Sequence, residues 1–333
     1  MANGDIVRAF EGEFARYVGA RYCVALCNGT ATLHTALVVL GVKPRDRVAV
    51  PPLTMASTTI AVLHAGAVPV FLDVEPDTWL MLPIHPEGDP RFGVGVSLFG
   101  LHGPYHEATT VDDAAQTLRS HGGAAFTSYS FQRSKILSCG EGGALVTNDE
   151  DLARKAREFS SLGYQFGPDS SQIDSQQIRS PTYARHYSLG WNYRMADAQA
   201  AVLLEKLGHA DRLLADRREA AALYQRAIEG CDWLTPQYVH NGYTHDYWTY
   251  AVALDRSDRW EPLAQAIVRH SGERPYAAWR LTYREPAFRY LAPDGTCPVA
   301  EGLQPRLMQF QTNDLHAAGR NSMALRRAIE EMG

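Results

Sequence analysis

The sequence predicts an α/β protein in which helices flank one large, mostly parallel sheet, with a small α+β unit following it. Seven short β-rich runs recur in the first half of the chain, helical patterns separate several of them, and a longer helical pattern comes next. The chain has 333 residues, 45% of them hydrophobic, enough to bury substantial cores without disulfides. We therefore expect two domains, residues 1–205 and 206–333.

The predicted strands are short runs of β-branched, aromatic and other apolar residues. Helical patterns over 31–40 and about 55–65 lie between the first three runs, as in a sheet with helices on its faces. The predicted strands are 22–26, 47–50, 68–74, 94–99, 109–113, 125–130 and 144–148.

Two further features complete the predicted fold. The connection between Phe99 and Thr109 is shorter than the dozen or so residues that a parallel crossover usually needs, so a helix is expected to be missing there. One long helical pattern, 196–228, leaves the sheet region and is expected to join the two domains. After it, a strand at 247–254, a helix at 260–270 and a C-terminal helix are enough for the small α+β domain.

The composition of the chain limits which binding partners and which cellular location we expect for the protein. A net charge of -5 and 32 Lys plus Arg without a basic run argue against a nucleic-acid surface or an anionic-membrane anchor. The N-terminal segment carries acidic residues and no apolar run reaches about 18 residues, so we expect a cytoplasmic protein. Of its five cysteines only Cys23 and Cys27 are close, which favours ordinary buried cysteines over a metal site.

Lys135 stands between a serine-aromatic run and a Gly-Glu-Gly-Gly turn, in the stretch FTSYSFQRSKILSCGEGGALVTND. A partly desolvated lysine can attack a carbonyl group, and pyridoxal phosphate is the commonest cofactor held in that way. This cofactor also needs a carboxylate beside its pyridine nitrogen, and backbone N–H groups, hydroxyls and a helix N-terminus around its phosphate.

The sequence contains residues of each of these kinds. Asp112 and Asp113 end a predicted strand, where carboxylates can face the ligand crevice of an α/β sheet. Gly29 lets the backbone approach a ligand closely after the first strand, and Thr30 is expected to cap the helix that follows. Each motif also has an ordinary structural interpretation, since such turns are more often structural and most lysines are solvated. None of these motifs alone establishes a cofactor site.

Taken together and in this order, the motifs match a known family. The chain resembles the DegT/StrS group of fold-type I, pyridoxal-phosphate-dependent aminotransferases, which aminate keto-sugars. The resemblance is close over about residues 8–210 and loose over the C-terminal third. It implies transfer of an amino group from glutamate or glutamine to a keto-sugar, cyclitol or related ketone in antibiotic or polysaccharide biosynthesis. The segments that carry it are NGTATLHTAL, VPPLTMASTTIAVLHAGAVPVFLDVEPDTW, DDAAQ, YSFQRSKILSCGEGGALVTND and LGWNYRMADAQAAVLLEKL.

The resemblance also implies roles for individual residues. Lys135 would bind the cofactor covalently and then act as the acid and base of the reaction. Asp113 would pair with the pyridine nitrogen, and Gln116 would contact the ring hydroxyl. Asn192 would reach the phosphate of the neighbouring subunit's cofactor, which implies a homodimer with shared active sites and an inactive monomer. The full cofactor-binding set is Gly29, Thr30, Met55, Asp113, Gln116, Ser130, Lys135 and Asn192; among these, Gly29, Thr30 and Ser130 would hold the phosphate.

The chain also departs from the family pattern. Met55 replaces a usual aromatic residue, although a thioether can also cover an aromatic face. The segment preceding Phe10 is shorter than usual, and so are 100–108 and 117–125, which in the family help to form the substrate pocket. The acceptor is therefore left open.

Two segments outside the family motifs are of interest. The polar segment 163–188, with its Gly and Pro, is expected to form a mobile loop over the site or the partner subunit. The aromatic and cationic stretch 274–288 either lines the substrate pocket or forms a core strand and turn. Its candidate pocket residues are Tyr276, Trp279 and Arg280.

Two alternatives to transamination are another pyridoxal-phosphate reaction, such as elimination or deoxygenation, and a non-catalytic relative. The sugar dehydratases of the family carry histidine in place of the lysine, so Lys135 argues against that subtype. A non-catalytic relative is expected to have lost the lysine or the aspartate, and both are present. A hydrolase and a dinucleotide enzyme are disfavoured because the chain has no G-x-S-x-G elbow, and no G-x-G-x-x-G follows the first predicted strand.

Overall fold

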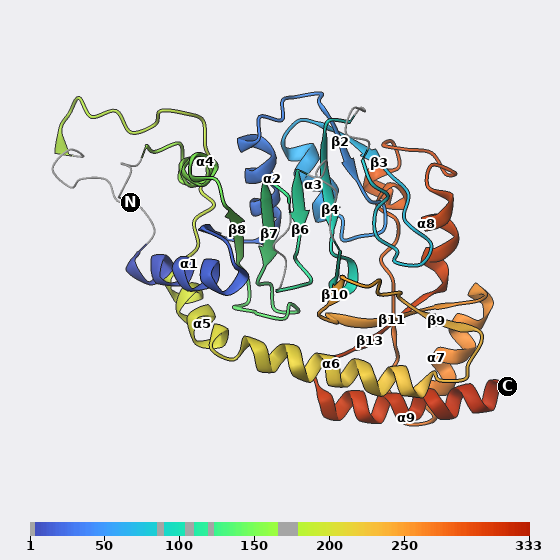
Figure 1. The fold of residues 1–333 in the computed structure, drawn as a ribbon. Coiled ribbons are helices and arrows are strands. Elements are labelled where there is room, and N and C mark those ends of the chain that lie inside the picture. The colour runs from blue at the N-terminus through green and yellow to red at the C-terminus, as the bar shows by residue number, and fades with distance from the viewer. Residues whose placement is uncertain (1–3, 85–89, 104–109, 119–122, 166–178) are drawn as a thin grey trace.

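The computed structural model describes residues 4–84, 90–103, 110–118, 123–165 and 179–333. Its largest element is a seven-stranded sheet in the order β1-β8-β7-β6-β4-β2-β3 (Figure 1). Neighbouring strands run parallel except where β8 pairs with β1 and β7, so the mostly parallel sheet is confirmed. The strands are β1 (Tyr22–Leu26), β2 (Arg47–Val50), β3 (Val68–Phe71), β4 (Phe92–Val96), β6 (Val111–Asp113), β7 (Phe126–Ser130) and β8 (Gly143–Thr147).

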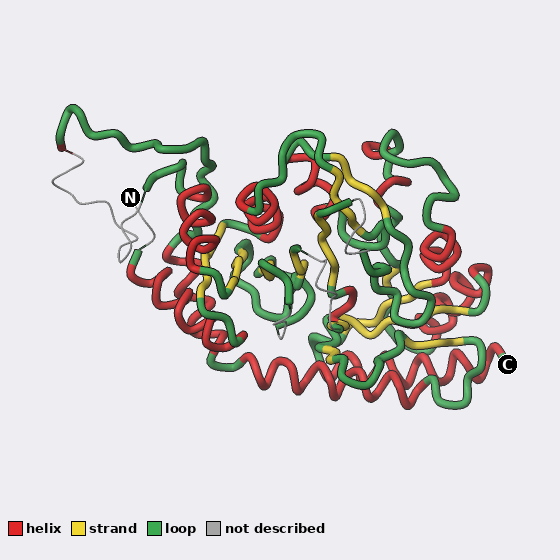
Figure 2. The backbone as a smooth tube through the Cα atoms, turned by 45° about the horizontal axis from the view of Figure 1, so that its top comes forward, coloured by secondary structure: helices red, strands yellow, loops and turns green. Residues whose placement is uncertain are grey.

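Both faces of this sheet are buried, which explains why its strands are almost continuously apolar. In β1, Val24 and Leu26 belong to one core with α2 (Gly29–Val39) and α3 (Ser57–His64), while Cys23 and Ala25 point into a second core with α1 (Asp5–Val18) and α5 (Asp197–Leu207). Figure 2 shows the strands in yellow enclosed by helices in red. These helices are α1 (Asp5–Val18), α2 (Gly29–Val39), α3 (Ser57–His64), α4 (Glu150–Ser160) and α5 (Asp197–Leu207).

The connection between β4 and β6 is short, as its spacing predicts. Its described residues form a 3₁₀ turn at Leu98–Gly100 and the two-residue strand β5 (Leu101–His102), without an α-helix. β5 pairs with β10 (Thr244–His245), so this connection contacts the C-terminal half of the chain. Residues 104–109 lie outside the described residues.

The long helical pattern over 196–228 is two helices, and the expectation of a single helix is wrong. α5 ends at Gly208, and α6 (Ala210–Ala227) begins after His209. α5 packs against α1 on the large sheet, whereas α6 lies beside α9 (Leu315–Met332) in the C-terminal half, so the chain must change direction between α5 and α6 (Figure 1).

The C-terminal half contains an antiparallel sheet in the order β12-β13-β11-β9 and its own apolar core. This arrangement agrees with a small α+β unit, while the boundary between residues 205 and 206 stays a prediction. The strands are β9 (Leu234–Pro236), β11 (Thr249–Leu254), β12 (Tyr276–Ala277) and β13 (Leu307–Gln311), and the helices are α7 (Trp260–Arg269), α8 (Pro298–Leu303) and α9 (Leu315–Met332).

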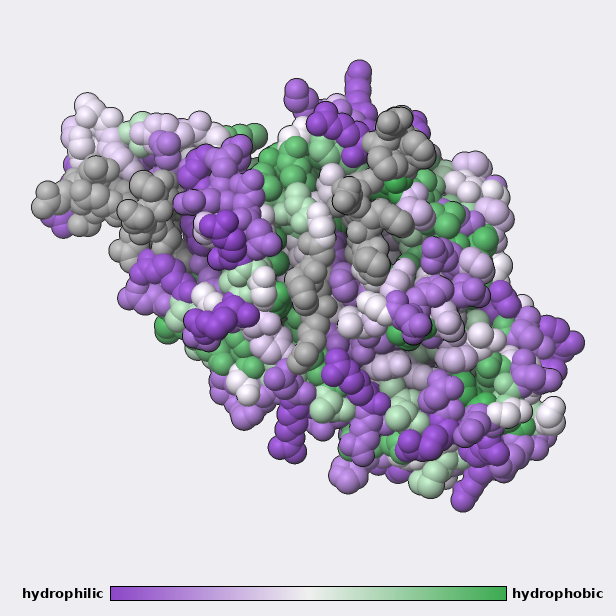
Figure 3. All heavy atoms as spheres, in the orientation of Figure 1, coloured by the Kyte–Doolittle hydropathy of each residue, from purple (hydrophilic) through white to green (hydrophobic). Residues whose placement is uncertain are grey.

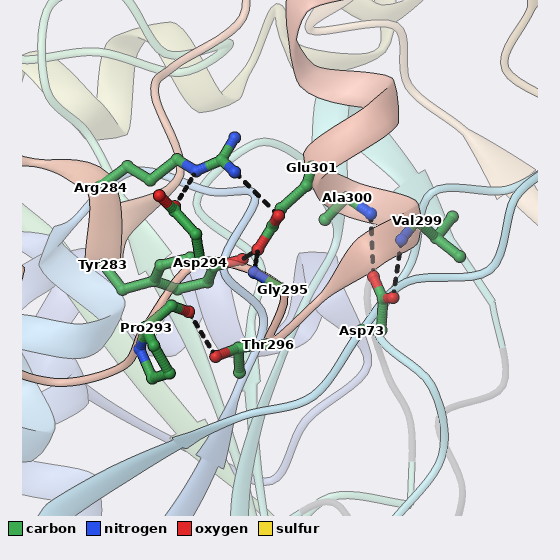
Figure 4. A network of polar contacts seen from close by, with 10 residues as sticks. All are labelled: Asp73, Tyr283, Arg284, Pro293, Asp294, Gly295, Thr296, Val299, Ala300 and Glu301. Atoms are coloured by element: carbon green, nitrogen blue, oxygen red, sulfur yellow. Dashed lines mark hydrogen bonds and ion pairs between the residues drawn. The ribbon is translucent and has the colours of Figure 1, made fainter.

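A polar network fastens the C-terminal half to the edge of the large sheet (Figure 4). The carboxylate of Asp73, just beyond β3, accepts hydrogen bonds from the backbone N–H groups of Val299 (2.8 Å) and Ala300 (2.9 Å) at the start of α8. On the same helix, Glu301 accepts a hydrogen bond of 2.6 Å from the hydroxyl of Tyr283. The network therefore joins the start of α8 to the edge of the large sheet.

Candidate active site

A cavity of about 580 Å³ lies between the large sheet and the C-terminal half. It is bounded by the N-terminus of α2, the ends of β6 and β7, the turn that contains Lys135, and residues of α6, β11, β12 and β13. Seven of the eight residues predicted to bind the cofactor line it together: Gly29, Thr30, Met55, Asp113, Gln116, Ser130 and Lys135.

Asp113 is the buried carboxylate of this cavity, with 4% of its surface exposed. Its Oδ2 accepts a hydrogen bond of 2.8 Å from the hydroxyl of Thr58, and its Oδ1 accepts one of 3.2 Å from the N–H of Ala115. Burial raises the pKa of Asp113, while these hydrogen bonds and the charge of Lys135 lower it in part. Since successive strand residues point to opposite faces, Asp112 does not line the cavity and contacts Ser97 instead.

Lys135 lies in the turn between β7 and β8, half-buried in the wall of the cavity. Burial lowers the pKa of Lys135, and the opposing charge of Asp113 raises it in part. A lowered pKa increases the fraction of neutral amine near neutral pH, and the neutral amine is the nucleophile. Gly140, with φ of 95°, then turns the chain into β8, as expected of the Gly-Glu-Gly-Gly motif.

The N-terminus of α2 meets the end of β7 at very close range. A Cβ atom on Gly29 would lie 2.9 Å from the Cβ of Ser130, so only glycine fits between the two segments. The N-cap is Asn28, whose Oδ1 accepts from the N–H of Ala31 at 2.8 Å, and the expectation that Thr30 caps the helix is wrong. Thr30 is in the first turn, where the N–H groups have no intrahelical acceptor and favour an anion.

Gln116 is buried with a fixed orientation. Its Oε1 accepts a hydrogen bond of 2.7 Å from the N–H of Phe99, a residue in the left-handed region with φ of 61°. Because a backbone N–H can only donate, the oxygen of Gln116 must face Phe99. The NH₂ group is therefore free of that contact and can donate to a ligand oxygen in the cavity.

Other predicted residues are placed differently. Met55 lines the cavity with half of its surface exposed, whereas Asn192 is exposed and is not among the cavity residues. Tyr276 and Trp279 line the cavity, but Arg280 is exposed outside it.

The expected loop over 163–188 does not cover this cavity with any described residue. Its described ends extend away from the sheet beyond α4 (Figure 1). Residues 166–178 lie outside the described residues, as do parts of the shortened segments 100–108 and 117–125.

Several cavity residues were not predicted. Ser57 is one of them and lies within a matched motif, two residues after Met55, which is a signal that could have identified it. Thr58, which does not line the cavity but donates to Asp113, lies beside it. Further unpredicted residues come from the C-terminal half, where the chain carries no recognisable motif. They include Arg217, Trp248, Gln309, Gln311 and Asn313.

Residues 1–87 and 105–316 match the DegT/DnrJ/EryC1/StrS aminotransferase family. This chain belongs to that family. It is therefore a pyridoxal-phosphate-dependent aminotransferase. This confirms the family, the fold-type I class and the cofactor that its motifs led us to expect.

Individual relatives of this aminotransferase agree with the family assignment. The spore coat polysaccharide biosynthesis protein SpsC of Bacillus subtilis is 32% identical over 277 residues, 77% of this chain and 70% of the relative. GDP-perosamine synthase of Caulobacter vibrioides is 30% identical over 280 residues, 75% of this chain and 70% of the relative. The structure of DesV from S. venezuelae superimposes with a TM-score of 0.85 at 27% identity, covering 99% of this chain and 90% of DesV.

The residues of this aminotransferase's cavity fit pyridoxal phosphate. The close approach of Gly29 and Ser130 leaves a small space that a Cβ atom would fill. This space lies beside the N-terminus of α2, whose backbone N–H groups favour a phosphate. A buried carboxylate, Asp113, and a half-buried amine, Lys135, line the same cavity. The pyridine nitrogen of the cofactor requires such a carboxylate, and its aldehyde requires such an amine. Among the described residues no helix has both the length and the apolar character to cross a membrane.

Proposed function

We propose that this aminotransferase transfers an amino group from glutamate or glutamine to a keto-sugar, a cyclitol or a related ketone in a biosynthetic pathway. The observation that carries the proposal is the convergence of Lys135, Asp113 and the N-terminus of α2 on one cavity. The substrate class is supported by the names of the relatives, which belong to polysaccharide biosynthesis and perosamine synthesis.

Each predicted residue has a proposed role. When bound, pyridoxal phosphate supplies the aldehyde that receives the amino group and the ring that takes up electrons. The amine of Lys135 binds the cofactor, and its Nζ later carries the proton that moves at the reacting carbon. Asp113 keeps the ring nitrogen protonated, and the NH₂ of Gln116 donates to the ring oxygen. Gly29, Thr30 and Ser130 hold the phosphate, and Met55 lies over the ring.

The site is proposed to be shared between two copies of the chain. Asn192 lies outside its own cavity and is exposed, so it is available to a neighbouring subunit. Exposed apolar side chains precede it closely in the sequence: Trp191 is 50% exposed, Tyr187 61% and Leu189 90%. Such a patch on an enzyme surface favours a protein interface. The cytoplasmic location stays a prediction.

The first test is the visible absorption of the purified protein with pyridoxal phosphate, before and after L-glutamate or L-glutamine. We expect the wild type to acquire the band of lysine-bound cofactor and to lose it when the donor is added. Lys135→Ala should bind the cofactor without that band. A wild type that forms no band refutes the proposed role of Lys135.

The acceptor needs a separate experiment. Keto-sugars and cyclitol ketones are incubated with the donor-treated enzyme, and recovery of the original band reports amino transfer to the ketone. If the donors bleach the band and no such ketone restores it, the proposed acceptor class is wrong although the aminotransferase chemistry stands.

A further inference from the structure

Trp248 brings an aromatic ring from the C-terminal half to the amine of Lys135. It lies directly before β11, and Nζ of Lys135 is 4.8 Å from the centroid of its ring. An ammonium group within about 6 Å of the face of a tryptophan is attracted to it, more strongly when the pair is partly desolvated. Both residues line the cavity.

The position of Trp248 is set by polar contacts at both ends of the residue. Its indole Nε1–H donates a hydrogen bond of 2.8 Å to the carbonyl of Ser134, the residue before Lys135. Its own carbonyl accepts from Nη1 of Arg217 at 3.0 Å and from the hydroxyl of Thr312 at 3.1 Å. The ring is therefore bonded to the same turn that carries the amine it faces.

A stack of aromatic rings also contacts Trp248. Trp248 stacks on Trp279 with centroids 5.6 Å apart and 14° between the planes, and Trp279 stacks on Phe99 at 6.2 Å and 21°. Phe99 in turn is held through its N–H by Gln116. Gly100 permits this packing, because φ is 101° there and a Cβ atom would lie 2.8 Å from the N of Trp248.

We propose that Trp248 is a positioning residue of this aminotransferase, whose ring holds the amine of Lys135 at the cavity wall whenever that amine is free. The assignment rests on the proposed role of Lys135. It gives the C-terminal half a direct part in the reaction, because the ring that orients the amine lies directly before β11 and stacks on Trp279.

The proposal predicts the sign of an effect on protonation. The charged and titratable groups that share the cavity with Lys135 are Asp113 on β6, Arg217 on α6, Glu141 in the turn before β8 and Tyr276 on β12. The aromatic face and the two carboxylates favour the ammonium form, while burial and Arg217 favour the neutral amine. Removing the ring alone should therefore lower the pKa of Lys135.

The test measures the pKa of Lys135 in the full-length protein without cofactor, from the pH dependence of its labelling by trace acetic anhydride. We expect Trp248→Leu to lower this pKa by roughly 0.4–1.5 units, and Trp248→Phe to give an intermediate value. The matched control is Trp260→Leu. Trp260 also faces a cation, Arg274 at 5.4 Å, and donates to a carbonyl, that of Leu307 at 2.9 Å, but it is not among the cavity residues.

A kinetic readout complements the labelling. With a misplaced amine, Trp248→Phe should lower kcat roughly ten- to hundredfold with little change in KM for the donor. A pKa that stays unchanged or rises in both Trp248 variants overturns the proposal, and Trp248→Phe keeps the test usable if Trp248→Leu fails to fold. The labelling needs no cofactor. If the wild type forms no absorption band with pyridoxal phosphate, the proposed function fails, and that result does not depend on the labelling of the Trp248 variants.

Discussion

At the scale of single residues, the site depends on a carboxylate that folding places away from water. Burial raises the pKa of Asp113, and the hydroxyl of Thr58 counteracts this rise by donating to the ionised form at 2.8 Å. The neighbouring Thr59 is equally buried, but its hydroxyl has no hydrogen-bond partner within the described part of the chain. Two adjacent threonines of α3 therefore form a matched pair for experiment.

We expect Thr58→Val to weaken the binding of pyridoxal phosphate roughly tenfold or more, because a hydrogen bond to a charged group contributes about 1.5–3 kcal/mol. Losing the donor also raises the pKa of Asp113 further. The carboxylate then takes up its proton at a higher pH, and the loss of cofactor affinity on acidification should move to higher pH with it. Spectroscopic titration with the cofactor at several pH values measures both effects.

Thr59→Val is the control, and it should bind the cofactor like the wild type and be no less stable, since no partner is left unbonded. Equal losses of affinity in both variants would mean that packing of α3, and not the hydroxyl of Thr58, supports the site.

At the scale of elements, the proposed phosphate cradle is a junction of α2 with β7 and β8. Gly29 is separated from Ser130 by less than the space of a methyl group, and a Cβ atom on Gly143 would lie 2.7 Å from the backbone of Asn28. Hence the first turn of α2 lies directly against the ends of two strands. The geometry of the anion site thus depends on two glycines far apart in the sequence.

Gly29→Ala should lower the affinity for pyridoxal phosphate by roughly tenfold or more, because the added methyl group pushes the N-terminus of α2 away from Ser130. Isothermal titration with the cofactor and with inorganic phosphate measures the change.

Gly12→Ala serves as the comparison on α1, where an added Cβ meets no atom within 4 Å. This variant should gain up to about 1 kcal/mol in free energy of unfolding from helix propensity and keep its affinity. Unchanged affinity in Gly29→Ala would show that the cradle does not hold the phosphate.

At the scale of the whole molecule, the distribution of exposed apolar residues bears on assembly. Hydrophilic residues interrupt the hydrophobic ones over the face shown in Figure 3. Around Asn192, in contrast, Leu189 and Trp191 are exposed in one short segment. In the proposed dimer, a second copy of the chain buries these side chains and receives Asn192 in its cavity.

Mixing two inactive variants tests this arrangement. If Asn192 serves the partner's cavity, a dimer of Lys135→Ala with Asn192→Ala has one intact site, so random exchange should restore about a quarter of wild-type activity. Activity after unfolding and refolding the mixture measures this, with each variant refolded alone as the control. No recovery, together with dimers by sedimentation, would place Asn192 in the cavity of its own subunit or outside the reaction.

What the sequence alone determined is local in character. The alternation of β-rich runs and helices predicted the sheet, and the motifs around Gly29, Asp113 and Lys135 predicted the family and seven of the residues that line the cavity. Strand and turn preferences depend on neighbouring residues, which is why they can be read from the chain. The capping of α2 by Asn28 and the break at Gly208 were missed because several nearby residues suited the same local pattern.

Tertiary structure alone decided which distant side chains complete the site. Trp248 and Gln309 reach the cavity because the C-terminal sheet is docked on the large one, and no local pattern marks them. The separation of Asp112 from Asp113 likewise follows from the orientation of β6 within its sheet. Such contacts join residues that are far apart in the chain, so they arise from packing and burial and not from the preferences of any single segment.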